Sequence, residues 1–278
     1  RRWGAIALRT FVLLLIVAAL AEIQYKRTSD RMTVIYLLDQ SLSIPDAQRR
    51  AMIGYVNAEI RKHRNADRGD RAGVIVFDHP LIKHKLGHLR EKSTSHRPFR
   101  ALMYQIAGLM VFEATRSLPL HTVEIETPLE RMKVERLSAK ITVVPILRAG
   151  LGLAEGILEM MPEARLGHLG LARDEHTLKP VVYLKKLPKD LNEGPVLIVD
   201  PMLATGGSAI QAIQLIREVG VKDVRFVCLV ASPEGIVKLR EADPELTIYA
   251  AAVDRELSEK GFILPGLGDA GDRLYGTS

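Results

Sequence analysis

The stretch VLIVDPMLATGGSAIQAI, Val196 to Ile213, decides the fold of this chain. Its first four residues are apolar and are bounded by turn residues, which predicts a buried parallel strand over Val196–Val199. Ala209 to Val219 carries apolar residues at helical spacing and stops at Gly220, a residue type that is common just after helices. A strand, a short loop and a helix in this order predict an α/β protein, with a mainly parallel sheet and helices on both faces.

The loop between that strand and that helix is predicted to bind an anion. Residues 204–208, ATGGS, open the helix, where unpaired backbone N–H groups and the helix dipole attract phosphate. Glycines let the backbone approach a ligand closely. Asp200 follows the strand and is placed to accept hydrogen bonds from sugar hydroxyls, so the stretch indicates a site for a ribose 5-phosphate. The alternative is a tight turn that is capped by Ser208 and binds no ligand.

Composition and charge narrow the class of protein. The chain has 278 residues, 47% hydrophobic and 26% charged, which is typical of a folded globular protein. Residues 1–76 hold 13 Lys+Arg against 7 Asp+Glu, whereas residues 77–278 hold 26 of each, so the net charge of +6 lies in the first quarter. Without a basic stripe interleaved with aromatic residues, no nucleic-acid partner is predicted. The single cysteine, Cys228, lies in the apolar run VRFVCLVA and is interpreted as a core thiol.

The first 31 residues form a separate segment. Phe11 to Ala21 is an unbroken apolar run, which is shorter than the roughly 20 residues that a membrane-spanning helix needs. Extension to residues 3–23 gives an adequate length but includes Arg9. We interpret the segment as a membrane anchor. A cleaved signal peptide that ends with ALA at residues 19–21 and a buried globular helix are the alternatives.

Residues 32–76 carry a second pattern. An apolar strand runs into the loop DQSLS, and an amphipathic helix and a strand over Ala72–Phe77 follow. This order resembles the opening of a von Willebrand factor A domain, whose D-x-S-x-S loop holds a divalent metal through oxygen ligands. Asp39, Ser41 and Ser43 match that loop, but the later threonine and aspartate of that family are missing. We interpret the loop as vestigial; a membrane-anchored, metal-dependent binding protein is the alternative function.

From residue 77 to residue 278 the chain has one continuous pattern. DPMLATGGS resembles the phosphoribosyl-diphosphate signature of uracil phosphoribosyltransferases, and further matching segments are FDHPLIKHKLGHLR, VPILRAGLGL, ARDEHTLKPVVYLKKLP, VASPEGI and GFILPGLGDAGDRLYGT. The resemblance implies a type I phosphoribosyltransferase fold with a hood and a β-arm. It also implies Mg²⁺-assisted transfer of phosphoribose from 5-phosphoribosyl-1-diphosphate to uracil, giving UMP and pyrophosphate. A cytoplasmic homo-oligomer is expected, and some relatives bind GTP as an effector.

The resemblance also assigns site residues. Catalysis is expected of Arg148, Asp200 and Asp269. The residues expected to contact the diphosphate and ribose are Arg148, Arg173, Asp200, Pro201, Met202, Leu203, Ala204, Thr205, Gly206, Gly207, Ser208 and Asp269. Uracil is expected to contact Ile263, Gly268, Asp269 and Ala270.

Two departures and one alternative accompany the resemblance. Val181 to Pro188 is expected to belong to a mobile β-arm, but Leu184 stands where the family usually has an aromatic residue and Lys179 where it has an acid. Many enzymes of the wider phosphoribosyltransferase class have two adjacent acids at this loop, whereas here Asp200 is followed by Pro201. The uracil-specific family shares this feature, which supports the resemblance and implies that Mg²⁺ binds mostly through substrate and water. The alternative, a related phosphoribosyltransferase with another base or a regulatory role, would differ in the loop at residues 261–271.

Overall fold

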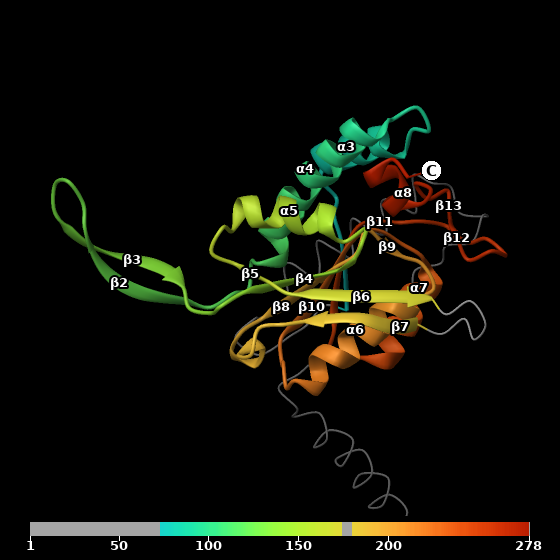
Figure 1. The fold of residues 1–278 in the computed structure, drawn as a ribbon. Helices are drawn as coiled ribbons and strands as arrows, with labels where there is room; N and C mark the ends of the chain where they lie inside the picture. Colours follow the sequence, from blue (N-terminus) through green and yellow to red (C-terminus); the bar gives the residue numbers. More distant parts are fainter. Residues whose placement is uncertain (1–72, 174–179, 278) are drawn as a thin grey trace, which may run out of the picture.

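The computed structural model describes residues 73–173 and 180–277 (Figure 1). The expected membrane anchor at residues 3–23 and the loop of Asp39, Ser41 and Ser43 lie outside this part of the chain. Within it, no helix combines the length and the apolar character that a membrane span requires.

The central sheet is built from the apolar runs of the sequence. The described residues form nine strands in it, along the path β1-β11-β10-β8-β4-β6-β7, with β5 paired to β4 and β9 to β10. The bounds are β1 Val74–Val76, β4 Thr142–Leu147, β5 Arg165–Leu166, β6 His168–Arg173, β7 Pro180–Lys186, β8 Val196–Val199, β9 Met202–Leu203, β10 Val224–Ala231 and β11 Thr247–Val253. All pairs are parallel except β6 with β7.

Helices cover both faces of this sheet. The bounds are α3 Pro80–Arg90, α4 His96–Ala114, α5 Leu151–Met160, α6 Gly207–Glu218, α7 Pro233–Ala242 and α8 Ala270–Tyr275, with a short 3-10 helix η2 at Leu191–Glu193. In Figure 1, α3, α4, α5 and α8 lie above the sheet and α6 and α7 below it. Two small antiparallel pairs complete the described fold: β2 Leu120–Glu126 with β3 Arg131–Leu137, and β12 Glu256–Leu257 with β13 Ile263–Leu264.

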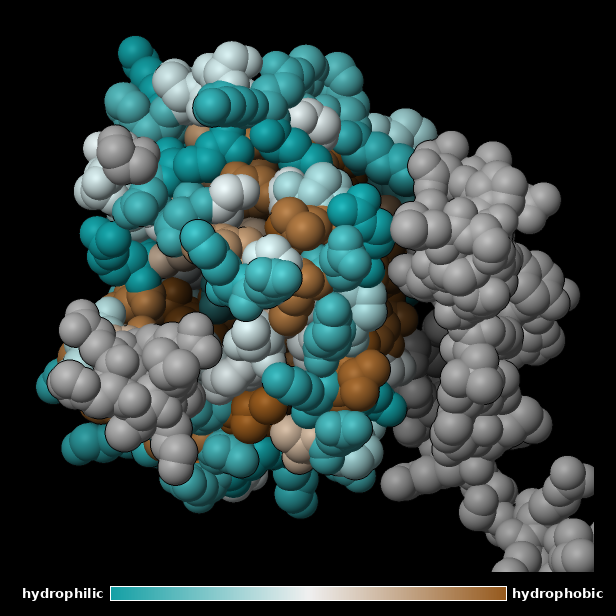
Figure 2. Space-filling model, turned by 90° about the vertical axis from the view of Figure 1, so that its right-hand side faces the viewer, coloured by the Kyte–Doolittle hydropathy of each residue, from teal (hydrophilic) through white to brown (hydrophobic). Residues whose placement is uncertain are grey.

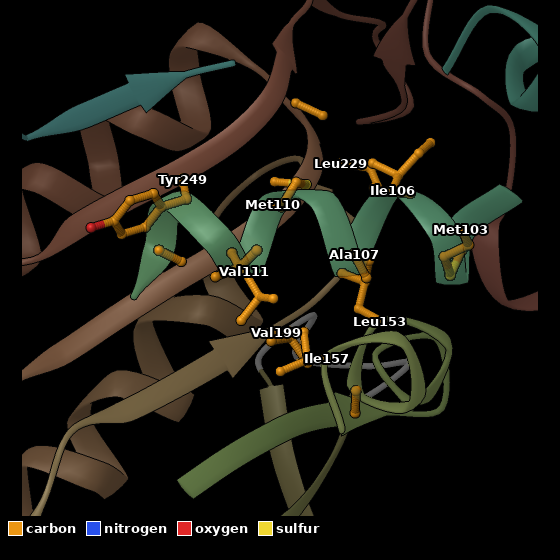
Figure 3. Close-up of a cluster of buried hydrophobic side chains, with 14 of the residues drawn as sticks. Met103, Ile106, Ala107, Met110, Val111, Leu153, Ile157, Val199, Leu229 and Tyr249 are labelled. Carbon is orange, nitrogen blue, oxygen red and sulfur yellow. The ribbon is translucent and has the colours of Figure 1, made fainter. Parts of the chain in front are cut away.

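The core lies in two layers, one on each face of the sheet. On the upper face, α4 contributes a row of fully buried side chains that includes Met103, Ile106 and Met110. These pack against α5 and against the strands, as Figure 3 shows for Leu153 and Tyr249. Because the central strands are buried on both faces, they are apolar at nearly every position rather than at alternate ones.

The strand predicted at Val196–Val199 is confirmed as β8, with all four residues buried. The helix predicted to begin at Ala209 begins two residues earlier, at Gly207, because the loop glycines take part in its first turn. Cys228 is completely buried in β10, as expected of a core thiol. Val74–Val76, which the sequence placed at the end of the von Willebrand-like segment, pairs with β11, so the sheet already includes residues before Phe77.

The segment expected in a β-arm takes a different place. Pro180–Lys186 forms β7, which pairs with β6 at the end of the main sheet. The ribbon that projects from the body is instead β2 with β3, and its residues are mostly exposed (Figure 1). Sequence reasoning missed this hairpin although the signal is present. Apolar and charged residues alternate in both strands, so that half-buried Val123 pairs with half-buried Val134 on one face and Glu124 pairs with Lys133 on the other.

A close helix contact tests this packing. A Cβ added to Gly156 of α5 would lie 2.3 Å from the backbone oxygen of Tyr104 and 2.9 Å from the Cβ of Ala107, both on α4. Gly156→Ala is therefore expected to lower the free energy of unfolding by about 1–3 kcal/mol, because the two helices must separate. Urea denaturation measures this change.

The matched control is Gly87→Ala, at an exposed position in α3 where no described atom lies within 4 Å of the added Cβ. Alanine suits a helix better than glycine does, so this variant is expected to gain about 0.5–1 kcal/mol. Equal changes in the two variants would contradict the close approach of α4 and α5.

Candidate functional site

Three loops leave the sheet at the same edge. Because β4, β8, β10 and β11 are parallel, their carboxyl ends lie together, toward the right in Figure 1. We name the loops by one residue each: the Arg148 loop (148–150) follows β4, the Asp200 loop (200–206) follows β8, and the Gly268 loop (261–269) contains β13 and leads into α8. Figure 2 looks onto this side, where apolar residues are exposed among hydrophilic ones. Ligands of open α/β sheets bind at such an edge.

The Asp200 loop presents free helix N–H groups. Its backbone is fixed by the Pro201 carbonyl, which accepts from the N–H groups of Leu229 and Val230 at 3.1 Å each. Gly206, with φ of 80°, is the N-cap of α6 and supplies no side-chain cap, and a Cβ added to Gly207 would meet no described atom within 4 Å. Ser208 does not cap this turn, because it lies exposed inside the first turn of α6. The open N–H groups suit a phosphate.

Asp200 is an acid in a mostly apolar setting at the start of this loop. Desolvation by the surrounding protein raises the pKa of its carboxyl group to about 7, and the N–H of Met202, 3.4 Å from Oδ1, opposes this shift only in part. The residue keeps some exposed surface, so a ligand can reach it. Behind it, burial raises the pKa of the Cys228 thiol, and the nearby Asp200 charge adds to this, so Cys228 stays protonated.

The Arg148 loop carries an exposed guanidinium group. Its backbone is held by the Tyr275 hydroxyl, which donates to the Arg148 carbonyl at 3.1 Å. The guanidinium carbon lies 5.6 Å from the centre of the Tyr275 ring, and Nη2 lies 3.8 Å from Asp272. A Cβ at Gly150 would meet the Val199 oxygen at 2.4 Å, so this loop turns directly against β8.

The Gly268 loop is held mainly through its backbone. Ile263 and Ala270 are buried, whereas Gly268, with φ of 80°, is exposed. Asp269 is also exposed, and its Oδ1 caps α8 by accepting from the N–H of Asp272 at 2.9 Å. Gly268 makes no backbone hydrogen bond to another described residue, so its N–H and C=O are available to a ligand.

Contacts between the loops show that they form one site. A Cβ at Gly261, just before β13, would lie 3.5 Å from Cγ2 of Thr205 in the Asp200 loop. A Cβ at Gly271, in the first turn of α8 directly after the Gly268 loop, would lie 3.9 Å from the Cβ of Ala149 in the Arg148 loop. The site therefore combines the N–H groups at the start of α6, one half-buried and desolvated acid, an exposed arginine and the exposed backbone of Gly268.

A family model for uracil phosphoribosyltransferase matches residues 76–277, most of the chain. The chain belongs to the uracil phosphoribosyltransferase family. Curated relatives carry this name: that of Dictyoglomus thermophilum is 54% identical over 205 residues, 73% of this chain and 99% of the relative, and that of Staphylococcus aureus is 54% identical over 205 residues, 73% and 98%.

A solved structure agrees with the family. The AQ2163 protein from Aquifex aeolicus is 39% identical, covers 74% of this chain and 99% of its own, and superimposes with a TM-score of 0.71. The predicted fold is confirmed: a mainly parallel sheet flanked by helices, of the type I phosphoribosyltransferase fold.

The uracil phosphoribosyltransferase site also uses residues that sequence reasoning missed. Ser232, completely buried, donates from Oγ to the Ala204 carbonyl at 2.6 Å and accepts from the N–H of Gly235 at 2.9 Å. A Cβ at Gly235 would meet the same Ala204 oxygen at 2.3 Å. The segment VASPEGI thus holds the backbone of the Asp200 loop at Ala204. Its serine and proline form a helix-start signal, which could have indicated the cap but not the loop that it contacts.

One expected site residue and the two positions that depart from the family lie near or beyond the edge of the sheet. Arg173 is the last residue of β6, at the same edge of the sheet, and Lys179 lies outside the described residues. Leu184, the position where the family usually has an aromatic residue, is half-buried in β7.

The raised pKa of Asp200 predicts a stability effect. An unfolded aspartate has a pKa near 4, so between about pH 4 and pH 7 the folded chain holds a proton that the unfolded chain releases. Stability of the wild type therefore falls as pH rises through this window, and Asp200→Asn removes the loss. The melting temperature of the variant minus that of the wild type is expected to grow from pH 4 to pH 8, as measured by calorimetry. A constant difference would contradict the desolvated carboxyl group.

Proposed function

We propose that this chain transfers phosphoribose from 5-phosphoribosyl-1-diphosphate to N1 of uracil, giving UMP and pyrophosphate, as the names of its relatives indicate. The observation that carries the proposal is the approach of Gly261 to Thr205, which brings the Gly268 loop beside the Asp200 loop. A base and the sugar phosphate to which it becomes joined would then be held by neighbouring backbone segments.

The 5-phosphate would bind at the start of α6. The N–H groups there lack a side-chain cap, and the Thr205 and Ser208 hydroxyls lie in the same turn. Pro201 and Leu203 are buried and serve through their backbone, whereas Met202, Ala204 and Gly207 keep some exposed surface. Phosphate in this place would gain both hydrogen bonds and the field of the helix dipole.

Asp200 would grip the ribose. An ionised carboxylate accepts hydrogen bonds from sugar hydroxyls, and its charge stabilises the cationic sugar that forms as the bond to pyrophosphate breaks. The pKa of about 7 means that the free protein shares its population between the two protonation states at neutral pH. Hydroxyl donors and a developing positive charge both favour the ionised form. Substrate binding would therefore lower the pKa of the Asp200 carboxyl group and raise its ionised fraction.

Arg148 and Arg173 would bind the diphosphate. The Arg148 side chain is 59% exposed, and its Nη2 lies 3.8 Å from the carboxylate of Asp272, too far for a tight hydrogen bond, so the guanidinium group can turn to an incoming anion. A guanidinium group binds phosphate oxygens in pairs, which fixes the leaving group as well as attracting it. Arg173 would add a second positive charge from the end of β6.

Uracil would be read by backbone groups of the Gly268 loop. Its edge presents acceptor, donor and acceptor, and Gly268 has an N–H and a C=O without a partner among the described residues. The side chains of Ile263 and Ala270 are buried, so these residues would contact the base through the main chain. Cytosine carries a donor where uracil has O4, and a fixed backbone group would reject it.

Magnesium would come with the substrate. The described residues contain no group of three or more His, Cys, Asp or Glu side chains able to hold a metal by themselves. Mg²⁺ usually keeps several waters and is bound through substrate phosphates with one or two carboxylates, and Asp200 and exposed Asp269 at this edge fit that mode. When bound, the ion would neutralise charge on the departing pyrophosphate.

Three expectations stay predictions from the resemblance. They are the assembly into a homo-oligomer, activation by GTP, and a cytoplasmic location of the enzymatic part. Membrane attachment through residues 3–23 also stays a prediction, because that segment lies outside the described residues.

The direct test is to incubate the full chain with uracil, 5-phosphoribosyl-1-diphosphate and Mg²⁺ and to measure UMP by chromatography. UMP is expected with uracil and not with cytosine, and chelation of Mg²⁺ is expected to slow its formation. Asp200→Asn is expected to lower turnover at least tenfold, because the amide carries no charge. Folded wild-type protein that forms no UMP would refute the proposed activity, and unchanged turnover in Asp200→Asn would remove that residue from the site.

A second test separates the two substrates. Arg148→Ala is expected to raise the KM for the diphosphate substrate at least tenfold, since the variant lacks the forked charge, while the KM for uracil changes less than threefold. Steady-state kinetics with each substrate varied in turn give both constants. Arg131→Ala is the matched control, because Arg131 is exposed and lies in β3, on the projecting ribbon. Equal changes in both KM values for Arg148→Ala would contradict its role.

A further inference from the structure

We infer that the buried ion pair of Arg90 and Asp254 is the positioning element that sets the affinity of this enzyme for its base. The inference rests on the proposed function and deepens it, because neither Arg90 nor Asp254 is among the residues expected to contact the substrates. Arg90 is the last residue of α3, and Asp254 follows β11 at the carboxyl edge of the sheet. They lie 164 residues apart in the sequence.

The pair is bidentate and largely removed from water. Arg90 donates from Nη1 to Oδ2 of Asp254 at 2.7 Å and from Nη2 to Oδ1 at 2.6 Å. The side chains are 22% and 6% exposed. Two parallel charge-assisted bonds fix the plane of both groups as well as their separation, so any third group bound to the pair is also fixed.

That third group is the backbone of Gly266. Its N–H donates to Oδ2 of Asp254 at 2.8 Å, and its carbonyl accepts from Nη1 of Arg90 at 2.7 Å. Both polar groups of one peptide position are thus held by the pair. Gly266 has a φ of 64°, and a Cβ there would meet the Ile263 oxygen at 2.2 Å, so this backbone conformation requires glycine.

Gly266 lies in the middle of the Gly268 loop, between the residues expected to meet uracil. The neighbouring positions are tied as well: the Leu264 carbonyl accepts from the N–H of Arg255 at 3.0 Å, and the Leu267 carbonyl accepts from Arg273 at 2.7 Å. Arg273 also donates to the Glu91 carbonyl at 2.6 Å, just after α3. The loop is therefore anchored to the end of α3 at two points, and the free groups of Gly268 are presented at a fixed place.

Positioning of this kind affects the two substrates unequally. The Asp200 loop is held by β10 and Ser232, not by Arg90 or Asp254. Loss of the pair should loosen the backbone that reads the base while leaving the phosphate and diphosphate contacts in place. A group displaced by a fraction of an ångström loses much of a hydrogen bond, so the KM for uracil should respond first.

The experiment uses the full chain with Asp254→Asn. Three N–H donors, two from Arg90 and one from Gly266, converge on the Asp254 carboxylate. An asparagine amide offers one acceptor oxygen, and its NH₂ group would face an N–H donor in place of the second oxygen. The KM for uracil is expected to rise at least tenfold and that for the diphosphate substrate less than threefold. Arg90→Lys keeps the positive charge but lacks the bidentate guanidinium group. This variant is expected to raise the KM for uracil by less than Asp254→Asn does, and to leave the KM for the diphosphate substrate within threefold of the wild type.

The matched control is Asp243→Asn, which breaks a similar ion pair. Arg217 donates from Nε to Asp243 at 2.8 Å with side chains 25% and 12% exposed, and this pair joins the end of α6 to the residue after α7. The control is expected to lower the melting temperature while changing both KM values less than twofold, as a purely structural pair would.

A KM for uracil within twofold of the wild type in folded Asp254→Asn would overturn the inference, as would equal rises in both KM values. If Asp254→Asn does not fold, Arg90→Lys decides by the same two criteria. A wild-type chain that makes no UMP would refute the proposed function, and the inference with it, whereas an active wild type with unaffected variants would refute the positioning role alone.

Discussion

The parallel pairing of β8, with β4 on one side and β10 on the other, is the constraint on which the rest of the structure depends. It sends the loops after these strands to one edge of the sheet and places the helices that follow on its faces. Each loop then needs support from a different element. The Asp200 loop rests on β10 and Ser232, the Arg148 loop on Tyr275, and the Gly268 loop on the end of α3.

The site carries costs that the core offsets. Asp200 is desolvated, which disfavours its charged form, and α6 begins at a glycine that supplies no side-chain cap. Each feature lowers the stability of the protein without ligand and, in the proposed function, would favour the binding of a charged, hydroxyl-rich ligand. The two clusters of buried apolar residues, one on each face of the sheet, offset the stability lost at the site. Substrate affinity and intrinsic stability therefore oppose one another at the same residues.

Sequence reasoning was most accurate where a pattern is local. Four apolar residues before Asp200 predicted β8 residue for residue, and the signals for α6 were correct to within two positions. It was least accurate for strands outside the buried centre of the sheet: the alternating β2–β3 ribbon was overlooked, and Val181–Pro188 was assigned to an arm although it pairs at the end of the main sheet. The two residues that hold Gly266, Arg90 and Asp254, were not predicted either, because they lie 164 residues apart and no sequence motif links them.

The sequence by itself determined the α/β class, the family and the local chemistry of each loop, because periodicity, turn residues and short motifs act over a few neighbouring residues. Only the tertiary structure decided which loops meet and what holds them. Thr205 lies beside Gly261, and Arg90 binds Asp254, because strand order and helix packing bring together residues that are far apart in the chain. The burial that raises the pKa of Asp200 is likewise a property of the folded surroundings, since desolvation depends on every element packed around the group.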